Sequence, residues 1–383
     1  MNSLKKILKS LFVPLSSLNN AIKKQPDRVF FYSNLGFRDN VKAVYDYMIE
    51  NGLNESFKIT VATDEYKAFK KNAPQNVKFV GLKSGIFSFL KAKYCFYSFG
   101  KYPIKPASEQ CVVNLWHGMP LKAIGRLEKG SENEDQNFFT KVIATSPFFA
   151  DIMCRAFGAG KEQALITPQP RCDEFLKDTP KPDFLKNYDK VIIWMPTFMS
   201  SQKLGRVDGD FGKVNPFDKD FLKSLSQTLK QNNMLLIIKP HPMDDEKSVD
   251  EEIENVIFLG EKELCEKNLN LYRLLKFSSA LVTDFSSIYF DYLYFNRPIA
   301  FACPDAESYR ENRGFVVDDI SELMPGYHIN SSSEFLAFLQ SVSDGQDVYE
   351  KQRTECRKLC SLYDGISGCE LILKNIGLLK SED

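Results

Sequence analysis

Short apolar segments alternate with amphipathic segments along most of this chain, and that alternation constrains its fold more than any other feature. The pattern starts near residue 28, stops at a polar stretch from 177 to 190, and then starts again. Strands that alternate with helices predict a parallel sheet with helices on both of its faces. Two such series in one chain predict an α/β protein with two domains.

The predicted elements have ordinary lengths for such a fold. In the first series, strands are predicted at 29–33, 59–62, 77–80, 94–98, 112–116 and 142–145, and helices at 40–51, 86–92 and 147–157. In the second series, strands are predicted at 191–194, 235–238, 256–259, 280–282 and 299–302, and helices at 218–231, 269–277 and 288–296. Helical patterns at 333–341, 348–362 and 369–378 close the chain.

These patterns divide the chain into four regions. We predict a basic amphipathic helix at 1–24, a first domain at 25–180, a second domain at 181–350, and closing helices at 351–383 that could cross back to the first domain. In the first region, leucine and isoleucine recur at helical spacing with lysines between them. Such a helix can lie on an anionic membrane surface, or it can pack on the first domain as an ordinary terminal helix.

Composition excludes several classes of protein. Lysine plus arginine and aspartate plus glutamate both number 50, so there is no overall positive charge to attract nucleic acid. The nine cysteines include no Cys-x-x-Cys pair, which indicates free thiols in a reducing compartment. No run approaches the ~20 apolar residues of a membrane span, and no secretory signal is evident at the start. We therefore expect a cytoplasmic protein, held at the inner face of the membrane if the basic helix binds there.

Histidines occupy two of the positions where a ligand is expected. Ligands of parallel α/β sheets bind outside the carboxyl ends of the strands. His117 follows the predicted strand at 112–116, and His241 follows the predicted strand at 235–238. One such histidine is usually structural, but one in each predicted domain indicates that both line a cleft between parallel sheets that face each other. His328 has no such context and is expected at the surface.

The residues next to His117 favour a role as a general base. Trp116 can shield the imidazole from water, and Gly118 allows a substrate to approach the main chain closely. Lys122 follows within reach of an anion. An imidazole with such neighbours can take a proton from a substrate hydroxyl.

Two more strand ends carry candidate residues in the second domain. His241 lies between two prolines and close to Lys239. The prolines restrict the backbone there, which suits a side chain that stabilises a leaving phosphate. Pro196 and Thr197 follow the first strand of this domain and open into a polar stretch at 200–215. That stretch is long for a connecting loop, so it is either a mobile lid or a surface insertion.

A turn between a strand and a helix of the second domain carries the remaining candidates, Thr283, Asp284, Ser286, Ser287 and Asp291. The free N–H groups and the positive end of the helix dipole at such a turn can hold a phosphate, or the small polar side chains can simply cap the helix. Mg²⁺ on Asp284 or Asp291 is conceivable, but one carboxylate among hydroxyls favours capping or ligand contact. No cofactor is therefore predicted.

Five short motifs occur in a fixed order. They are Trp116-His117-Gly118-x-Pro-Leu-Lys-x-Ile-Gly125, Pro170-Arg171-x-Asp173, Met195-Pro196-Thr197-Phe198, Lys239-Pro240-His241-Pro242 and Thr283-Asp284-x-Ser286-Ser287…Asp291…Pro298-Ile299. In order and spacing they resemble the CDP-glycerol glycerophosphotransferases, which include teichoic-acid primases and polymerases and related capsule enzymes. The resemblance extends from about residue 29 to at least residue 318, which is most of the chain.

The resemblance implies a GT-B-like fold of two Rossmann-like domains, with the acceptor bound by the first and the donor nucleotide mainly by the second. It implies transfer of glycerol phosphate from CDP-glycerol to a hydroxyl of a lipid-linked or polymeric acceptor, with release of CMP, during synthesis of teichoic-acid-like or capsular polymers. By position, His117 would be the base and His241 would assist at the diphosphate. The substrate-binding residues would be Trp116, Gly118, Lys122, Arg171, Pro196, Thr197, Lys239, Thr283, Asp284, Ser286, Ser287 and Asp291.

Three positions depart from the family pattern. Met119 stands where threonine is usual, Phe285 where tyrosine is usual, and Met199 where arginine is usual. Loss of a cation beside the donor could change which CDP-alditol is accepted, so a CDP-ribitol transferase is an alternative. A nucleotide-sugar transferase of the same architecture is another, although no glutamate lies between residues 280 and 306 to contact a donor sugar. A non-enzymatic binding protein would leave both strand-end histidines without a purpose.

Overall fold

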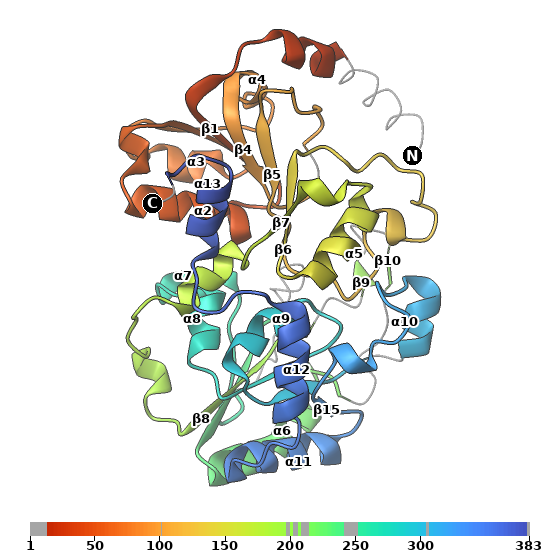
Figure 1. The fold of residues 1–383 in the computed structure, drawn as a ribbon. Coiled ribbons are helices and arrows are strands. Elements are labelled where there is room, and N and C mark those ends of the chain that lie inside the picture. Colours follow the sequence, from red (N-terminus) through yellow and green to blue (C-terminus); the bar gives the residue numbers. More distant parts are fainter. Residues whose placement is uncertain are drawn as a thin grey trace. The chain divides into compact units, whose positions relative to one another are not determined.

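The computed structural model describes residues 14–100, 102–196, 200–201, 206–207, 214–240, 252–303 and 306–380 (Figure 1). The chain divides into two compact units. Unit 1 comprises the described residues within Met1–Met119, Gly125–Leu176 and Ser361–Asp383, and unit 2 comprises those within Pro120–Ile124 and Lys177–Cys360. The chain passes from unit 1 to unit 2 after Leu176 and returns after Cys360, and it also enters unit 2 briefly at Pro120–Ile124.

Unit 1 is built on a seven-stranded parallel sheet with the order β3-β2-β1-β4-β5-β6-β7. Its strands are β1 (Gln25–Ser33), β2 (Lys58–Thr63), β3 (Val77–Val80), β4 (Ala92–Tyr97), β5 (Cys111–Asn114), β6 (Lys141–Ala144) and β7 (Ala164–Ile166). Its helices are α2 (Asp39–Glu50), α3 (Tyr66–Lys70), α4 (Ile86–Lys91), α5 (Pro147–Phe157) and α13 (Gly368–Asn375), with a further helical segment at 14–21. In the central strands β1, β4 and β5, the apolar residues toward the carboxyl end are mostly buried, as expected for a sheet covered on both faces.

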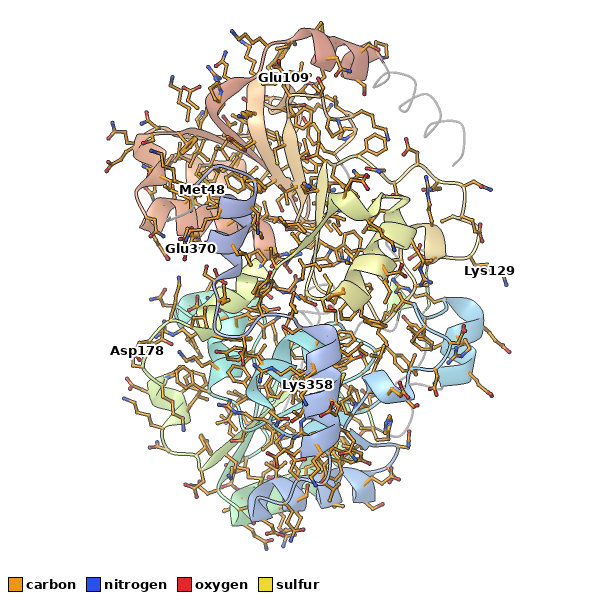
Figure 2. All side chains as sticks on the ribbon, in the orientation of Figure 1. Met48, Glu109, Lys129, Asp178, Lys358 and Glu370 are labelled. Atoms are coloured by element: carbon orange, nitrogen blue, oxygen red, sulfur yellow. The ribbon has the colours of Figure 1, made fainter. Side chains whose placement is uncertain are left out.

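Helices α2 and α13 lie together against the unit 1 sheet, although they come from opposite ends of the chain. Val44 and Met48 of α2 share one buried core with Phe31 of β1 and Ile372 of α13. Met48 and, on α13, Glu370 are labelled in Figure 2. Burial of each such apolar side chain contributes roughly 1.5–3 kcal/mol. The end of the chain is therefore part of the core of unit 1.

Asp173 fixes the return of α13 to unit 1. It lies in the 3₁₀ helix η4 (Pro170–Phe175). Its carboxylate accepts hydrogen bonds from Ser367 Oγ at 2.6 Å, Gly368 N at 2.6 Å and Cys369 N at 3.1 Å. These groups open α13, so the carboxylate satisfies N–H groups that have no partner inside the helix. The preceding helix, α12 (Glu350–Cys360), belongs to unit 2.

Unit 2 is built on a six-stranded sheet with the order β12-β11-β8-β13-β14-β15, and every strand pair in it is parallel. Its strands are β8 (Lys190–Trp194), β11 (Met234–Ile238), β12 (Val256–Phe258), β13 (Ala280–Thr283), β14 (Ile299–Phe301) and β15 (Tyr327–His328). Its other helices are α6 (Lys219–Gln231), α7 (Glu261–Glu266), α8 (Leu271–Lys276), α9 (Ile288–Tyr292), α10 (Ala306–Asn312) and α11 (Ser332–Asp344). A short antiparallel pair, β9 (Ser200–Ser201) and β10 (Arg206–Val207), follows β8.

The two sheets repeat one topology. When the strands of each unit are numbered from its own start, both sheets begin with the order 3-2-1-4-5-6, which is that of the dinucleotide-binding α/β fold. The order reverses between β1 and β4 in unit 1 and between β8 and β13 in unit 2. The prediction of two Rossmann-like parallel sheets is confirmed.

Some very short elements were not predicted from the sequence. Strands β7 and β15 have only three and two residues, which gives a weak period. The helix expected at 288–296 is α9 followed by a 3₁₀ turn, and the turn ends at Asn296 with φ +48°. Among the described residues, no helix is long and apolar enough to cross a membrane.

Candidate active site

His117 follows β5 at the carboxyl edge of the unit 1 sheet. The chain still pairs with β4 there, because Leu115 N donates to Tyr97 O at 2.7 Å. His117 Nδ1 lies 3.2 Å from the carbonyl oxygen of Ser98, the residue directly after β4. A carbonyl oxygen only accepts, so Nδ1 carries the proton of this bond, and the lone pair of the neutral ring belongs to Nε2. The imidazole therefore has the orientation and tautomer of a base that acts through Nε2.

The turn that carries His117 has a strained backbone. Trp116 has φ +47° and Gly118 has φ +114°. A bulky residue in the left-handed region costs roughly 1–3 kcal/mol, and the second angle is essentially restricted to glycine. The Trp116 ring lies 4.2 Å from the imidazole and packs edge-on against Phe157 at 4.9 Å. The indole thus covers one side of the imidazole.

Arg171 lies beside this turn. Its Nη1 donates to His117 O at 3.1 Å and to Asp39 Oδ2 at 2.7 Å. The Arg171 side chain is 8% exposed and that of Asp39 is 19% exposed. The structure thus brings together two residues that lie far apart in the sequence motifs, and these contacts of the guanidinium support the main chain under His117.

Three residues that the sequence analysis did not single out complete this edge: Asn40, Ser98 and Gln169. Ser98 Oγ accepts from Val41 N at 3.0 Å, at the start of α2. Asn40 Nδ2 donates to Gln169 Oε1 at 2.6 Å, across 129 residues of sequence. A polar residue at the start of a helix is ordinarily interpreted as a cap, and nothing local in the sequence distinguishes Asn40 from one.

The carboxyl edge of the unit 2 sheet gathers candidates from three neighbouring strands. Met195 N donates to a β13 carbonyl at 2.8 Å, and Thr283 Oγ1 donates back to Met195 O at 3.0 Å. Lys239 N donates to the last carbonyl of β8 at 2.9 Å. Pro196, Lys239 and Thr283 are therefore neighbours where the strand order reverses, which is where ligands of such sheets bind.

Two charged groups at this edge are buried. The Lys239 side chain is 2% exposed, and its Nζ lies 2.7 Å from Glu261 Oε1 at the start of α7. Asp284 is 1% exposed and directly follows β13. Buried charges are costly unless they are paired, so their presence at the ligand edge of a sheet indicates a functional site.

Lys122 belongs to this second edge. Lys122 lies close to His117 in the sequence, but Pro120–Ile124 belongs to unit 2, where Lys122 forms an isolated antiparallel bridge with Phe315. Its Nζ lies 5.4 Å from the centre of the Tyr309 ring. Burial raises the pKa of the Cys303 thiol, the charge of Asp284 raises it further, and the charge of Lys122 opposes both. Lys122 and Asp284 therefore both act on the strand end at Cys303.

The candidate residues after β13 differ in their contacts, with Ser286 and Ser287 in the turn and Asp291 in α9. Ser287 makes no side-chain cap to α9, and Ser286 Oγ reaches Ile288 N only at 3.5 Å. The simple capping interpretation is therefore weakly supported for both serines. Asp291, by contrast, is 7% exposed and accepts a hydrogen bond from Tyr272 OH at 2.7 Å. This contact joins α9 to α8, so Asp291 has a structural role that the sequence did not suggest.

His241, Thr197, most of the stretch at 200–215 and residues 1–13 of the predicted basic helix lie outside the described residues. His328 is exposed at the end of β15, where its ring lies 5.6 Å from Phe301. In the described part of the chain, no group of three or more histidine, cysteine, aspartate or glutamate side chains is arranged to hold a metal ion.

Comparison with known proteins is consistent with this geometry. The family model of CDP-glycerol:poly(glycerophosphate) glycerophosphotransferase matches residues 15–376. A teichoic acid glycerol-phosphate transferase of Staphylococcus aureus is 25% identical, over 97% of this chain and 99% of its own length. A teichoic acid poly(ribitol-phosphate) polymerase of Bacillus spizizenii is also 25% identical, over 80% of this chain. The chain spans about half the length of that polymerase (49%).

A solved structure shows the same fold. A variant of the wall teichoic acid polymerase TagF soaked with CDPG has a TM-score of 0.70 at 18% identity, over 98% of this chain and 99% of that one. Its likeness establishes the GT-B-like architecture with two parallel sheets. The family model covers nearly the whole chain and spans both carboxyl edges. The chain therefore belongs to the CDP-glycerol:poly(glycerophosphate) glycerophosphotransferase family and is a glycerophosphotransferase.

Proposed function

We propose that the two carboxyl edges divide the reaction between them. The unit 1 edge activates the acceptor hydroxyl through His117, and the unit 2 edge binds the diphosphate of CDP-glycerol. The observation that carries the proposal is the bond from His117 Nδ1 to Ser98 O, because it leaves Nε2 as the basic nitrogen. The buried Lys239 and the hydroxyls of Ser286 and Ser287 support donor binding, since cations and hydroxyl donors both stabilise phosphate.

The proposed chemistry is an in-line substitution at phosphorus. The acceptor oxygen attacks the phosphorus that carries glycerol, and its proton passes to Nε2 of His117. The bond between that phosphorus and the oxygen bridging to CMP breaks, and CMP leaves with the bond's electron pair. A positioned base contributes typically ~10²–10⁴-fold to such a step. Cations and N–H or O–H donors near the leaving phosphate supply the rest by stabilising developing charge.

The substitution His117→Ala tests the division of roles. We expect CMP release from CDP-glycerol to fall by about 10²–10⁴-fold. Affinity for CDP-glycerol, measured by calorimetry, should change little, because the donor is assigned to unit 2. His328→Ala is the matched control and should leave both measurements near the wild-type values. Unchanged CMP release from the His117→Ala protein would remove His117 from the chemistry.

The acceptor and the exact donor are part of the proposal. We infer a lipid-linked or polymeric acceptor of the teichoic-acid or capsular type, since the matching relatives act in teichoic acid synthesis. CDP-ribitol is the second candidate donor, because a ribitol-phosphate polymerase is among the relatives. A panel of CDP-glycerol, CDP-ribitol and nucleotide sugars, with released nucleotide identified by mass spectrometry, separates these cases. CMP release from CDP-ribitol alone would replace glycerol phosphate as the transferred group.

We also propose that unit 1 attaches to the cytoplasmic face of the membrane. The helical segment at 14–21 is tied to unit 1, in part because Lys24, just beyond it, donates to Leu90 O of α4 at 2.7 Å. Leu18 on that segment is 48% exposed, and Phe87 on α4 is 75% exposed. Exposed apolar side chains on elements near several lysines suit an anionic lipid surface.

Vesicle binding tests this attachment. Phe87→Ser should weaken sedimentation with phosphatidylglycerol vesicles by about tenfold or more, because burial of a phenyl ring is worth roughly 1.5–3 kcal/mol. Val348→Ser is the control, since Val348 is 68% exposed but lies in unit 2. Equal binding by both variants, or equal binding to phosphatidylcholine, would contradict the proposed surface.

A further inference from the structure

Asn40 joins the segments that surround His117. It is fully buried at the start of α2. Its Nδ2 lies 2.9 Å from Leu115 O, 3.1 Å from Trp116 O and 2.6 Å from Gln169 Oε1. Its Oδ1 accepts from Arg171 N at 3.1 Å. One side chain thus contacts the turn after β5 and the segment that begins η4.

The orientation of this amide is unambiguous. Two of its partners are main-chain carbonyls, which only accept, and a third is a main-chain N–H, which only donates. Exchanging the oxygen and nitrogen of Asn40 would place an acceptor against both carbonyls and a donor against the N–H group. Because Asn40 Nδ2 is a donor, the Gln169 atom that faces it must be the acceptor Oε1 and not Nε2. Gln169 is 2% exposed, and its Nε2 has no hydrogen-bond partner within the part of the chain that the structure describes.

Pairing with β4 holds the N–H side of the turn after β5 but not its carbonyls. Leu115 N donates to Tyr97 O of β4, and Trp116 N donates to Asn114 Oδ1 at 3.0 Å. The carbonyls of Leu115 and Trp116 are instead satisfied by the Asn40 amide. With Trp116 and Gly118 both at positive φ, the direction of the imidazole depends on those two carbonyls staying in place.

We propose that Asn40 is a positioning residue for His117. It holds the strained turn so that Nδ1 faces Ser98 O and Nε2 faces the acceptor hydroxyl. This inference rests on the proposed role of His117 as the base, and it adds a residue that no motif in the sequence contains. Asn40 itself touches neither substrate. It acts through the carbonyls of Leu115 and Trp116.

Asn40→Asp is the sharpest substitution. It keeps the size of the side chain and the oxygen that accepts from Arg171 N, but it replaces the amide donor with an oxygen that repels three acceptors. We expect kcat for CMP release to fall on the order of 10²-fold, since a small misplacement of a reacting group costs about that much. The KM for CDP-glycerol should change little. Asn255→Asp is the matched control, because Asn255 Nδ2 donates to Met234 O at 2.9 Å where β11 begins, away from the carboxyl edge of its sheet.

A double-mutant cycle separates positioning from a general structural effect. If Asn40 acts through His117, then Asn40→Asp should cause no further loss of CMP release in the His117→Ala background. A merely structural role predicts that the two losses multiply. Multiplied losses, or wild-type kcat in the single Asn40→Asp protein, would overturn the inference.

A second readout does not depend on turnover. The chain contains three histidines, so nitrogen-15 NMR of labelled histidine resolves the His117 ring. The wild-type ring should be protonated at Nδ1 near neutral pH, and Asn40→Asp should introduce the other tautomer, whereas Asn255→Asp should not. An unchanged His117 signal in Asn40→Asp would contradict positioning. If His117→Ala keeps full activity, the base role fails, while this signal still decides whether Asn40 orients the ring.

Gln169→Leu covers the case in which Asn40→Asp does not fold. It removes the acceptor 2.6 Å from the amide and leaves Asn40 in place. We expect a smaller loss of kcat, about tenfold, with the same lack of additivity in the His117→Ala background. No loss of kcat in a folded Gln169→Leu protein, together with an unaltered His117 tautomer, would also count against the proposal.

Discussion

The carboxyl edges of the two sheets have the same topology but are fastened in different ways. In unit 1, side chains bind main-chain atoms: Asn40 binds Leu115 O and Trp116 O, and Arg171 binds His117 O. In unit 2, the described strand ends are joined mainly by main-chain bonds, such as Met195 N to β13 and Lys239 N to β8. Thr283 Oγ1 adds one side-chain bond.

This difference follows from what each edge carries. A general base works through one ring nitrogen and must point in one direction, so the turn beneath His117 needs support from outside its own strand. A cation or a hydroxyl can meet a phosphate from several directions. The regular continuation of parallel strands is therefore enough to place Lys239 and Thr283. The unit 1 edge is held by side-chain hydrogen bonds of Asn40 and Arg171 to the main chain, which we call the clamp. The unit 2 edge is held by main-chain bonds that continue the sheet.

The largest expected effect comes from removing the clamp at Arg171. Arg171→Ala leaves Asp39, 19% exposed, without its partner at 2.7 Å. Loss of one member of a buried pair costs about 3–5 kcal/mol of unfolding free energy. We expect a cost near the lower end of that range, together with a loss of CMP release on the order of 10²-fold because the His117 carbonyl also loses its donor. Chemical denaturation and CMP assays measure the two quantities.

Arg155→Ala is the control for that prediction. Arg155 pairs with Asp151 in the same unit, but their side chains are 53% and 58% exposed. An exposed pair of this kind is worth about 0–1 kcal/mol, so stability and turnover should barely change. If the two arginine substitutions cost the same, the clamp does not distinguish the unit 1 edge.

A smaller effect is expected at the unit 2 edge. Lys239→Met removes a charge from a side chain that is 2% exposed, while its partner Glu261 is 44% exposed and can be hydrated. Replacement of a buried ion by an apolar group of similar shape is often neutral for stability. Affinity for CDP-glycerol should nevertheless fall by about tenfold, because one cation near the diphosphate is lost. Calorimetry and thermal unfolding test the two parts.

Substitution of the partner residue, Glu261, tests the same ion pair from its other side. Glu261→Gln keeps the buried Lys239 charge but removes the carboxylate 2.7 Å away. An uncompensated buried charge is more costly than none, so Glu261→Gln should destabilise the protein more than Lys239→Met does. It should weaken CDP-glycerol binding less, since the cation remains. The opposite order in either measurement would show that Lys239 acts in folding and not in donor binding.

The same comparison explains what the sequence could predict. The unit 2 edge was predictable because parallel strands end at one side of a sheet, so residues after successive strands must be neighbours. Pro196, Lys239 and Thr283 are neighbours for that reason. The clamp was not predictable, because its bonds join residues 75 and 129 positions apart and no strand period or motif encodes them.

Two further residues show where local interpretation ends. Lys122 follows His117 by a few positions, yet the chain enters unit 2 at Pro120, so proximity in sequence did not reveal that the two residues belong to different units. Asp291 belongs to the same motif as Ser286 and Ser287, yet its carboxylate is bound by Tyr272 OH inside the unit. A motif identifies which residues matter to a family, but it does not separate those that face a ligand from those that hold a helix.

The smallest expected effect concerns the third histidine, His328, which ends the edge strand β15 and lies two strands away from the reversal between β8 and β13. The His328 side chain is exposed at the end of β15, but partial desolvation of its ring lowers its pKa below the usual value of 6.5, and a hydrogen bond with the main chain of Met324 opposes that shift. The folded protein therefore binds this proton less readily than the unfolded chain, so His328 contributes stability above the usual pKa that is lost as pH falls through the folded pKa. His328→Gln should flatten the decline in melting temperature between about pH 7 and pH 5, with CMP release within about twofold of wild type. A large loss of CMP release would mean that the histidine at the carboxyl end of β15, two strands away from the β8–β13 reversal, takes part in the reaction, and the assignment of the base to His117 alone would be wrong.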